Sequence, residues 1–109
     1  MIERGAVFIA SEKGVLTRKP RPVLILQSDE VNAFYPTITL CLISATLTGQ
    51  HVFRVPVAPS ARNGLREPSE VQADRIFSFQ RESLDSRIGE LDEPDMTRVE
   101  TALRLWLDF

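Results

Sequence analysis

The most informative part of this sequence is residues 19–29, Lys19-Pro20-Arg21-Pro22-Val23-Leu24-Ile25-Leu26-Gln27-Ser28-Asp29. A basic turn stiffened by two prolines leads directly into a short apolar run, which fits a strand covered on both faces. Proline fixes its own φ angle and pushes the preceding residue into an extended conformation, so Arg21 is held on both sides. The stretch predicts a stiff strand entrance with a permanent positive charge. Such a site suits an anionic ligand, and a solvated arginine at a strand end is the alternative.

Length and composition indicate one globular domain over residues 1–109. Hydrophobic residues make up 43% of the chain and charged residues 26%, which is ordinary for a soluble globular protein. The longest apolar runs are far shorter than the roughly 18 residues of a membrane span, and the N-terminus lacks the layout of a signal peptide. The single cysteine, Cys41, cannot form an internal disulfide. We therefore expect a cytoplasmic protein that does not contact a membrane.

Charge is unevenly distributed along the chain. The net charge is −2, but residues 1–81 carry +3 and residues 82–109 carry −5. Four cations fall within nine residues, Lys13, Arg18, Lys19 and Arg21. A local patch of this kind can hold phosphates even on an acidic protein, and a solvated loop is the alternative.

The hydrophobic pattern predicts several short strands. We expect them at residues 6–10, 23–27, 37–43, 52–57, 71–79 and 86–91, with a single helical turn within 81–85. Residues 37–43 alternate small polar with large apolar side chains, as a strand with one core face does. Pro56 places the strand at 52–57 at an edge, or marks its end.

A helix is predicted to follow the last strand. Asp92 is a suitable N-cap, and Pro94 falls in the first turn. An apolar stripe recurs at helical spacing at Met96, Val99, Ala102, Leu103, Trp106 and Leu107, so the helix must pack on the sheet or on a partner. The pattern as a whole predicts a mainly β fold, a small and strongly bent sheet or barrel, with one C-terminal helix.

Few residues are suited to catalysis. With one His, one Cys and no carboxylate cluster at ligand spacing, a metal site is not expected. Cys41 lies in the alternating strand and is predicted to be buried and structural. His51, the one histidine of the sequence, is a candidate for acid–base chemistry, but no partner for it is visible. Ser44 and Thr46 end the alternating strand where it would meet Arg21, and Asp74 is expected to pair with the adjacent Arg75.

The ordered set of motifs resembles the MazF/PemK/Kid toxin family over nearly the whole chain. The matching residues are Arg4-Gly5, Arg21 to Asp29, Asn32, Pro36-Thr37, Leu42-Ile43-Ser44, Asn63-Gly64-Leu65, Pro68-Ser69, Asp74 with Ile76, and Ile88 to Asp92. The resemblance implies an SH3-like barrel of strongly twisted antiparallel strands with a C-terminal helix, assembled as a homodimer. It also implies the toxin of a type II toxin–antitoxin pair, which cleaves single-stranded RNA through 2′-OH attack without metal or other cofactor. A cognate antitoxin would wrap the dimer and occupy its RNA groove.

By position in the resemblance, Arg21 matches a catalytic arginine and Ser44 a position where the family often has a catalytic threonine. Asp74 matches an acid that lines the site in some members. The general base is left unassigned, with Asp74 and His51 as candidates. RNA contacts are expected from Lys13, Arg18, Lys19, Thr46 and Gln72.

The sequence departs from the family pattern in the site. Ala6 stands where an acid commonly follows Arg-Gly, and no Gly-x-Glu precedes Arg21. Gln72 stands where some relatives have arginine, and serine replaces threonine at Ser44. Two other functions remain open. One is a CcdB-like gyrase poison, which would act through C-terminal residues such as Trp106 and Phe109. The other is an SH3-like module that binds RNA or peptide without cutting it.

Overall fold

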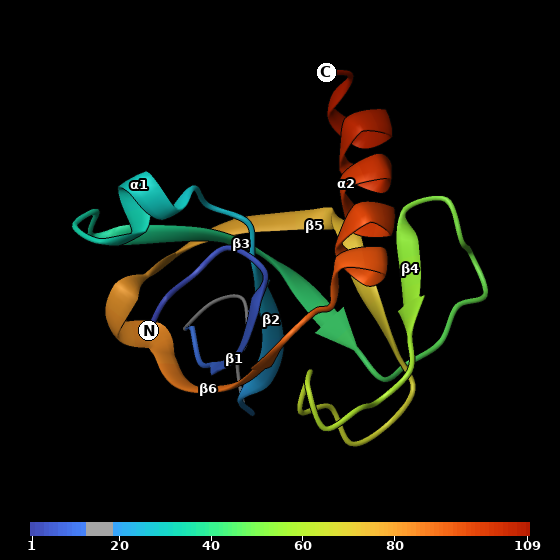
Figure 1. Cartoon of the computed structure of the whole chain (residues 1–109), viewed down its shortest axis with the longest axis horizontal. Helices are drawn as coiled ribbons and strands as arrows, with labels where there is room; N and C mark the ends of the chain where they lie inside the picture. The colour runs from blue at the N-terminus through green and yellow to red at the C-terminus, as the bar shows by residue number, and fades with distance from the viewer. Residues whose placement is uncertain (13–18) are drawn as a thin grey trace.

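The computed structural model describes residues 1–12 and 19–109. Its strands are β1 (Ala6–Ala10), β2 (Arg21–Ile25), β3 (Thr37–Ser44), β4 (Arg54–Val57), β5 (Ser69–Gln80) and β6 (Leu84–Glu90) (Figure 1). Its helical elements are α1 (Asp29–Asn32), the 3-10 turn η1 (Arg81–Ser83) and α2 (Glu93–Leu107). Six strands and one long terminal helix confirm the mainly β class. Neither α-helix in the described residues is long and apolar enough to cross a membrane.

All strand pairs in the described residues are antiparallel, in the order β4-β5-β3-β2-β1-β6. The sheet curls strongly, and in Figure 1 the left half of the molecule looks like a ring of strands. The expected strongly twisted antiparallel architecture is therefore present. The ladder is nevertheless not closed as in a complete barrel, because no described residue of β4 pairs with β6.

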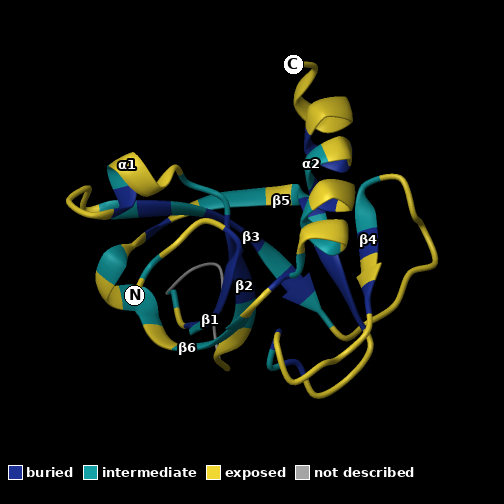
Figure 2. Ribbon diagram, in the orientation of Figure 1, coloured by how far each residue is buried: buried dark blue, intermediate teal, exposed yellow. Residues whose placement is uncertain are grey.

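Both faces of the central strands are buried, which explains the unbroken apolar run at Val23 to Leu26. Val7, Leu24 and Cys41 point into a core shared with α2. Their chain neighbours Phe8 and Val23 point into a second core, which is formed by buried residues of β1, β2, β3 and β5. In Figure 2 much of β1, β2 and β3 is dark blue, the colour of buried residues. As predicted, Cys41 is a buried structural residue, and burial raises the pKa of its thiol, which keeps it protonated.

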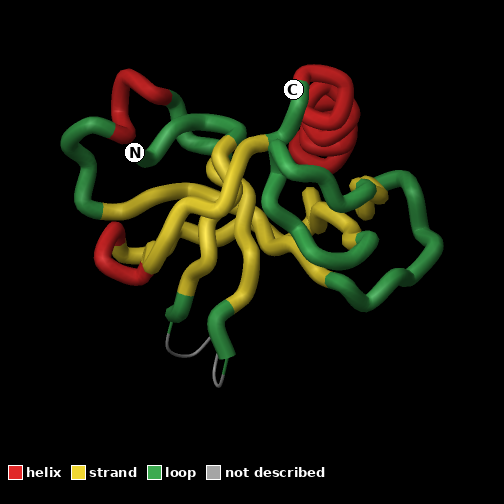
Figure 3. Tube along the Cα trace, turned by 60° about the horizontal axis from the view of Figure 1, so that its bottom comes forward, coloured by secondary structure: helices red, strands yellow, loops and turns green. Residues whose placement is uncertain are grey.

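The predicted helix start is confirmed. The Asp92 carboxylate accepts a hydrogen bond from the Asp95 backbone N–H at 2.9 Å, and Pro94 lies in the first turn. The helix packs on β4 and β5, and Figure 3 shows it nearly end-on against one side of the sheet.

Only the middle of the predicted apolar stripe of α2 is buried, at Val99, Ala102 and Leu103. Trp106 belongs to the predicted stripe but is 48% exposed, so it does not pack in the core as the stripe suggested. It lies against Phe53 instead, with the ring centroids 5.1 Å apart. Figure 1 shows the reason, since the last turns of α2 extend past the edge of β5.

The strand predictions are correct in number and order, and their ends differ by a few residues. The single helical turn expected at 81–85 is η1. The short helix α1 was not expected. It is capped by the Ser28 hydroxyl, which accepts a hydrogen bond from the Glu30 backbone N–H.

Strand β5 contains an irregularity that positions polar side chains near the site. Cys41 of β3 pairs with Ile76 of β5, whereas the next residue, Leu42, pairs with Gln72. Residues 73–75 of β5 therefore have no partner on β3, and the strand bends there toward β4. An irregularity of this kind often redirects side chains beside an active site.

Candidate active site

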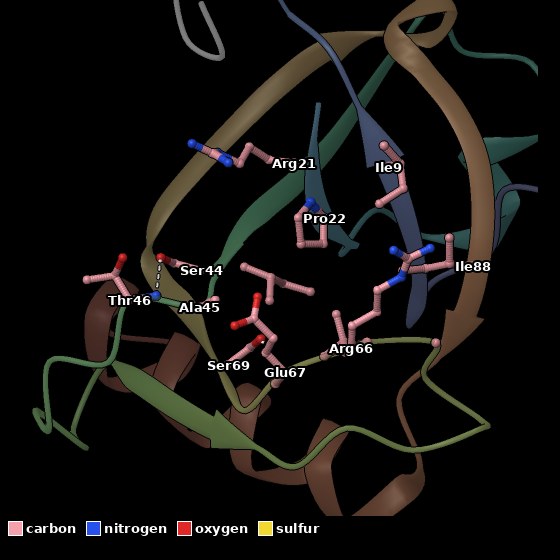
Figure 4. A pocket seen from close by; sticks show the side chains of 13 residues that line it. Ile9, Arg21, Pro22, Ser44, Ala45, Thr46, Arg66, Glu67, Ser69 and Ile88 are labelled. Carbon is pink, nitrogen blue, oxygen red and sulfur yellow. Dashed lines mark hydrogen bonds between the residues drawn. The ribbon is translucent and has the colours of Figure 1, made fainter. Parts of the chain in front are cut away.

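A cavity of about 470 Å³ opens where the ends of β2 and β3 meet the loop between β4 and β5. Figure 4 shows its side chains. Its apolar lining comes from Ile9, Pro22, Ile43, Leu65 and Ile88. Its polar and charged lining comes from Arg21, Ser44, Thr46, Arg66, Glu67 and Ser69. The cavity thus combines cations, hydroxyls and one carboxylate.

Arg21 is the first residue of β2 and is exposed at the mouth of the cavity. It lies opposite Ala10 of β1 in the ladder, and the prolines on either side restrict its backbone. In Figure 4 its side chain extends along the upper side of the cavity, away from the apolar residues. The expected cation at a stiff strand entrance is therefore present and open to a ligand.

Ser44 and Thr46 line the same cavity as Arg21, as predicted. Ser44 is the last residue of β3, and its Oγ accepts a hydrogen bond from the Thr46 backbone N–H at 3.0 Å. A hydroxyl that accepts in this way still carries its own proton to donate. Ser44 is therefore held in place and remains able to donate to a phosphate oxygen.

A smaller hollow adjoins the first one. It is lined by Arg21, Leu42, Ile43, Ser44, Gln72 and Arg75. Gln72 therefore lies next to the catalytic candidates Arg21 and Ser44. Arg75 was not among the predicted site residues. It is exposed here because β5 bends at residues 73–75.

The predicted Asp74–Arg75 pair is wrong, because Asp74 binds Arg54 of β4. The guanidinium donates to both carboxylate oxygens, at 2.7 and 3.0 Å. Both side chains are largely buried, with 15% and 19% of their surface exposed. These hydrogen bonds from Arg54 hold the pKa of Asp74 below its usual range. Asp74 lines neither hollow, so both its geometry and its low basicity argue against a role as general base.

The other predicted residues either line neither hollow or fall outside the residues that the structure describes. His51 lies in an exposed turn before β4 and lines neither hollow. Lys19 is exposed just before β2 and also lines neither. Lys13 and Arg18 lie outside the described residues. Of the predicted site residues, the structure brings together Arg21, Ser44, Thr46 and Gln72, whereas His51 and Asp74 line neither hollow.

Sequence reasoning missed the contribution of the loop at residues 58–68. This loop supplies Arg66 and Glu67 to the cavity. Its Asn63 is buried, and the side-chain Oδ1 accepts from the backbone N–H groups of Ser60 (3.0 Å) and Leu65 (2.9 Å). The turn chemistry of Asn63-Gly64 and Pro68 marked a loop, and the two charged residues between them were the signal that could have pointed to the site.

A second unexpected residue, Glu70, is 1% exposed and holds the loop that carries Thr46. Its carboxylate accepts hydrogen bonds from the Thr48 hydroxyl (2.8 Å) and from the backbone N–H groups of Thr48 (3.0 Å) and Gly49 (3.1 Å). Burial alone would raise the pKa of Glu70. The three hydrogen bonds and the charge of Arg54 outweigh that effect and lower it. Glu70 is thus an ionised, buried residue that holds the loop carrying Thr46, one of the residues that line the cavity.

Comparison with known proteins gives consistent matches along the chain. The sequence model of the PemK-like, MazF-like toxins of type II toxin-antitoxin systems matches residues 3–107. A probable endoribonuclease MazF of Mycolicibacterium smegmatis is 34% identical over 106 residues, covering 97% of this chain and 96% of that protein. The endoribonuclease EndoA of Bacillus subtilis is 27% identical, with coverages of 98% and 95%.

Solved structures agree with the sequence matches. The Mycobacterium tuberculosis toxin MazF-mt6 has a TM-score of 0.81 at 30% identity, covering 95% of this chain and 97% of that one. A mycobacterial endoribonuclease solved with its cognate antitoxin has a TM-score of 0.85 at 23% identity, with coverages of 100% and 97%. The second match bears on the fold alone.

Proposed function

This chain belongs to the PemK-like, MazF-like toxins of type II toxin–antitoxin systems, and we propose that it is a metal-independent endoribonuclease that cleaves single-stranded RNA and thereby blocks translation. The observation that carries this proposal is the cavity in which Arg21 and Ser44 lie together. The names of the relatives, MazF and EndoA endoribonucleases, support the same activity. They give no support to a gyrase poison or to a module that binds without cutting.

Arg21 and Ser44 fit the chemistry of attack by a 2′-hydroxyl on the adjacent phosphodiester. As the O2′–P bond forms, negative charge builds up on the two non-bridging oxygens. A guanidinium fork can bind both of these oxygens, and stabilising the developing charge is usually the largest catalytic contribution. Arg21 would supply that charge, and Ser44 would donate a hydrogen bond to the same phosphate. Thr46, Gln72 and Lys19 would contact the flanking nucleotides.

The proposed partners follow from the family. The protein would act in the cytoplasm as a homodimer, and a cognate antitoxin would inhibit it. One structural neighbour is an endoribonuclease solved with its antitoxin, and another is a MazE–MazF complex of Deinococcus radiodurans. The end of α2, with Phe109 just beyond it, offers an apolar surface for self-association, because Leu105, Leu107 and Phe109 are 63%, 48% and 78% exposed.

The test is incubation of the purified protein with a long single-stranded RNA in EDTA, followed by mapping of the fragment ends. We expect discrete cuts by the wild type. Arg21→Ala should abolish them without loss of the fold, and Ser44→Ala should reduce them less. Arg104→Ala removes the same charge from an exposed position that lines neither hollow, and it should cut normally. Cleavage by Arg21→Ala at the wild-type rate would show that the site is elsewhere.

The RNA itself tests the chemistry. A 2′-deoxy substitution at the nucleotide on the 5′ side of the mapped cut should block cleavage there and leave other cuts unchanged. Continued cleavage at the deoxy position would exclude 2′-hydroxyl attack.

A further inference from the structure

Glu67 lies in the loop between β4 and β5 and contributes the carboxylate that faces the Arg21 cavity. We propose that Glu67 is the general base that accepts the proton of the attacking 2′-hydroxyl. This inference rests on the endoribonuclease function proposed above and supplies the role that His51 and Asp74 do not fill.

The other acids near the site are engaged elsewhere. Asp74 is bound to Arg54 through both oxygens, and Glu70 is buried under three hydrogen bonds. Glu12, just before the undescribed residues, accepts a hydrogen bond from Ser83. Residues 13–18 contain no acid at all. Among the carboxylates of the described residues, only that of Glu67 lines the cavity with Arg21 and Ser44.

The Glu67 side chain is open to a ligand. The hydrogen bond that Ser69 Oγ donates to Glu67 goes to its backbone carbonyl, at 2.9 Å. In Figure 4 the carboxylate end of Glu67 points into the cavity, between Ser44 on one side and Arg66 on the other. A general base needs such access, since it must reach the substrate proton directly or through one water.

The backbone that carries Glu67 is fixed at both ends. On one side, Leu65 is buried and its N–H is bound by Asn63. On the other side, Pro68 restricts Glu67 to an extended conformation, and the buried Ser69 begins β5. Arg66 and Glu67 are thus two exposed charged residues between two anchored points. A catalytic group gains from being held in position before the substrate arrives.

The cations of the cavity could hold a substrate phosphate close to Glu67. Among residues 1–12 and 19–109, Arg21 of β2 and Arg66 of the same loop are the other charged groups that line the cavity. A substrate phosphate between these arginines would be held despite the carboxylate, and its neighbouring 2′-hydroxyl would face Glu67. In the reaction, Glu67 takes the proton of O2′, the O2′–P bond forms and the P–O5′ bond breaks. The bond pair goes to O5′, which takes a proton from water, and the hydroxide formed removes the proton from Glu67, so that the carboxylate and a water molecule are regenerated.

The experiment is a single-turnover cleavage assay across pH, on a short RNA that spans the mapped cut, with Glu67→Gln and its control Glu82→Gln. Both changes remove one exposed carboxylate, but Glu82 lies in η1 and does not line the cavity. Glu67→Gln should lower the rate about 10²–10³-fold, the usual range for a general base. The wild-type rate should decline toward low pH, and Glu67→Gln should remove that decline. Glu67→Asp should retain a pH-dependent rate between the two.

Other results of the same assay would contradict the role of Glu67 or the proposed function. If Glu67 were only a surface acid near bound phosphate, its removal would reduce repulsion, so cleavage would be unchanged or faster. Wild-type cleavage that Arg21→Ala abolishes but Glu67→Gln leaves intact would overturn the assignment and keep the proposed function. Absence of wild-type cleavage on all RNAs would overturn the function itself. Thermal unfolding of each variant shows whether the fold is kept.

Discussion

Individual charged residues in this protein divide into those that build the site and those that face its ligand. Arg54 binds Asp74, and Glu70 binds the loop that carries Thr46. In contrast, Arg21, Arg66 and Glu67 are exposed toward the cavity. The sequence alone could not separate the two groups. Asp74 and Arg75 are adjacent in the chain, but they fall where β5 bends, so the partner of Asp74 comes from β4.

The Arg54–Asp74 pair should contribute to stability more than to catalysis. Asp74→Asn leaves a largely buried guanidinium without its charged partner, which should lower the free energy of unfolding by about 1–3 kcal/mol. Chemical denaturation measures this loss. The cleavage rate should stay within about threefold of wild type, since a general base would instead contribute at least about a hundredfold. A loss as large as that would restore Asp74 as the base.

Stability should also fall in acid because of two depressed carboxyl groups. The pKa values of Asp74 and Glu70 are lowered in the folded protein, so the folded state binds fewer protons than the unfolded state. Their contribution is present above the ordinary carboxyl range of about pH 4 and is lost as the pH falls through their lower folded values. Denaturation at pH 7 and pH 3 should show the decrease. The double variant Glu70→Gln/Asp74→Asn should show a smaller one, and an equal decrease would contradict the assignment.

Among the elements, the loop at residues 58–68 connects β6 to the cavity. Its Arg62 carbonyl accepts a hydrogen bond from the Glu90 N–H of β6 at 3.0 Å. A Cβ placed on Gly64, where φ is +71°, would lie 2.1 Å from the Ile88 carbonyl oxygen. This close contact fixes the loop over the sheet and therefore fixes the residues that face the cavity.

Gly64→Ala should disturb both stability and cleavage. It combines a positive φ, which costs about 1–2 kcal/mol, with a backbone collision whose relief costs about 1–3 kcal/mol. Gly49→Ala is the matched control, because its φ is +74° and nothing lies within 4 Å of the added Cβ. Differential scanning calorimetry should show a larger fall in Tm for Gly64→Ala, and only this variant should lose cleavage rate. Equal effects would mean that the contact with Ile88 is not needed.

The sequence predicted most elements because each has a local signal. Asp92 and Pro94 fixed the start of α2, and the alternation at 37–43 fixed β3. The missed features depend on the register of distant segments. The bend in β5 is visible only against β3 and β4, and the loop at 58–68 becomes part of the site only through its contact with β6.

On the scale of the whole molecule, the curled sheet makes two cores, and α2 covers only one of them. The helix is longer than the surface it covers, so Leu105 in its final turn and Phe109 just after it are exposed to solvent. The apolar stripe in the sequence could not show that the end of the helix is exposed, because the width of the sheet under the helix depends on the order of the strands. An exposed apolar helix end of this kind often marks an interface.

If this surface joins two copies, Leu105→Glu/Phe109→Glu should convert the proposed dimer into a monomer. Introduced charges oppose burial at an interface but are tolerated at positions already exposed. Sedimentation equilibrium measures the mass. Phe34→Glu alters another exposed aromatic residue (72% exposed), which follows α1, an element that lies apart from the end of α2 in Figure 1, and it should leave the dimer intact. A wild-type monomer at high concentration, or a double variant that still dimerises, would rule out this interface.

The gap in the ladder between β4 and β6 has a consequence for efforts to retarget the protein to other RNA sequences. The loop that faces the cavity also fills part of that gap, where Gly64 lies against Ile88, and Gly89 lies against the carbonyl of Arg62. A loop transplanted from a relative would meet a strand shaped for a different backbone. A chimera that folds and cleaves would therefore need to take residues 58–68 and residues 84–90 together from the same relative.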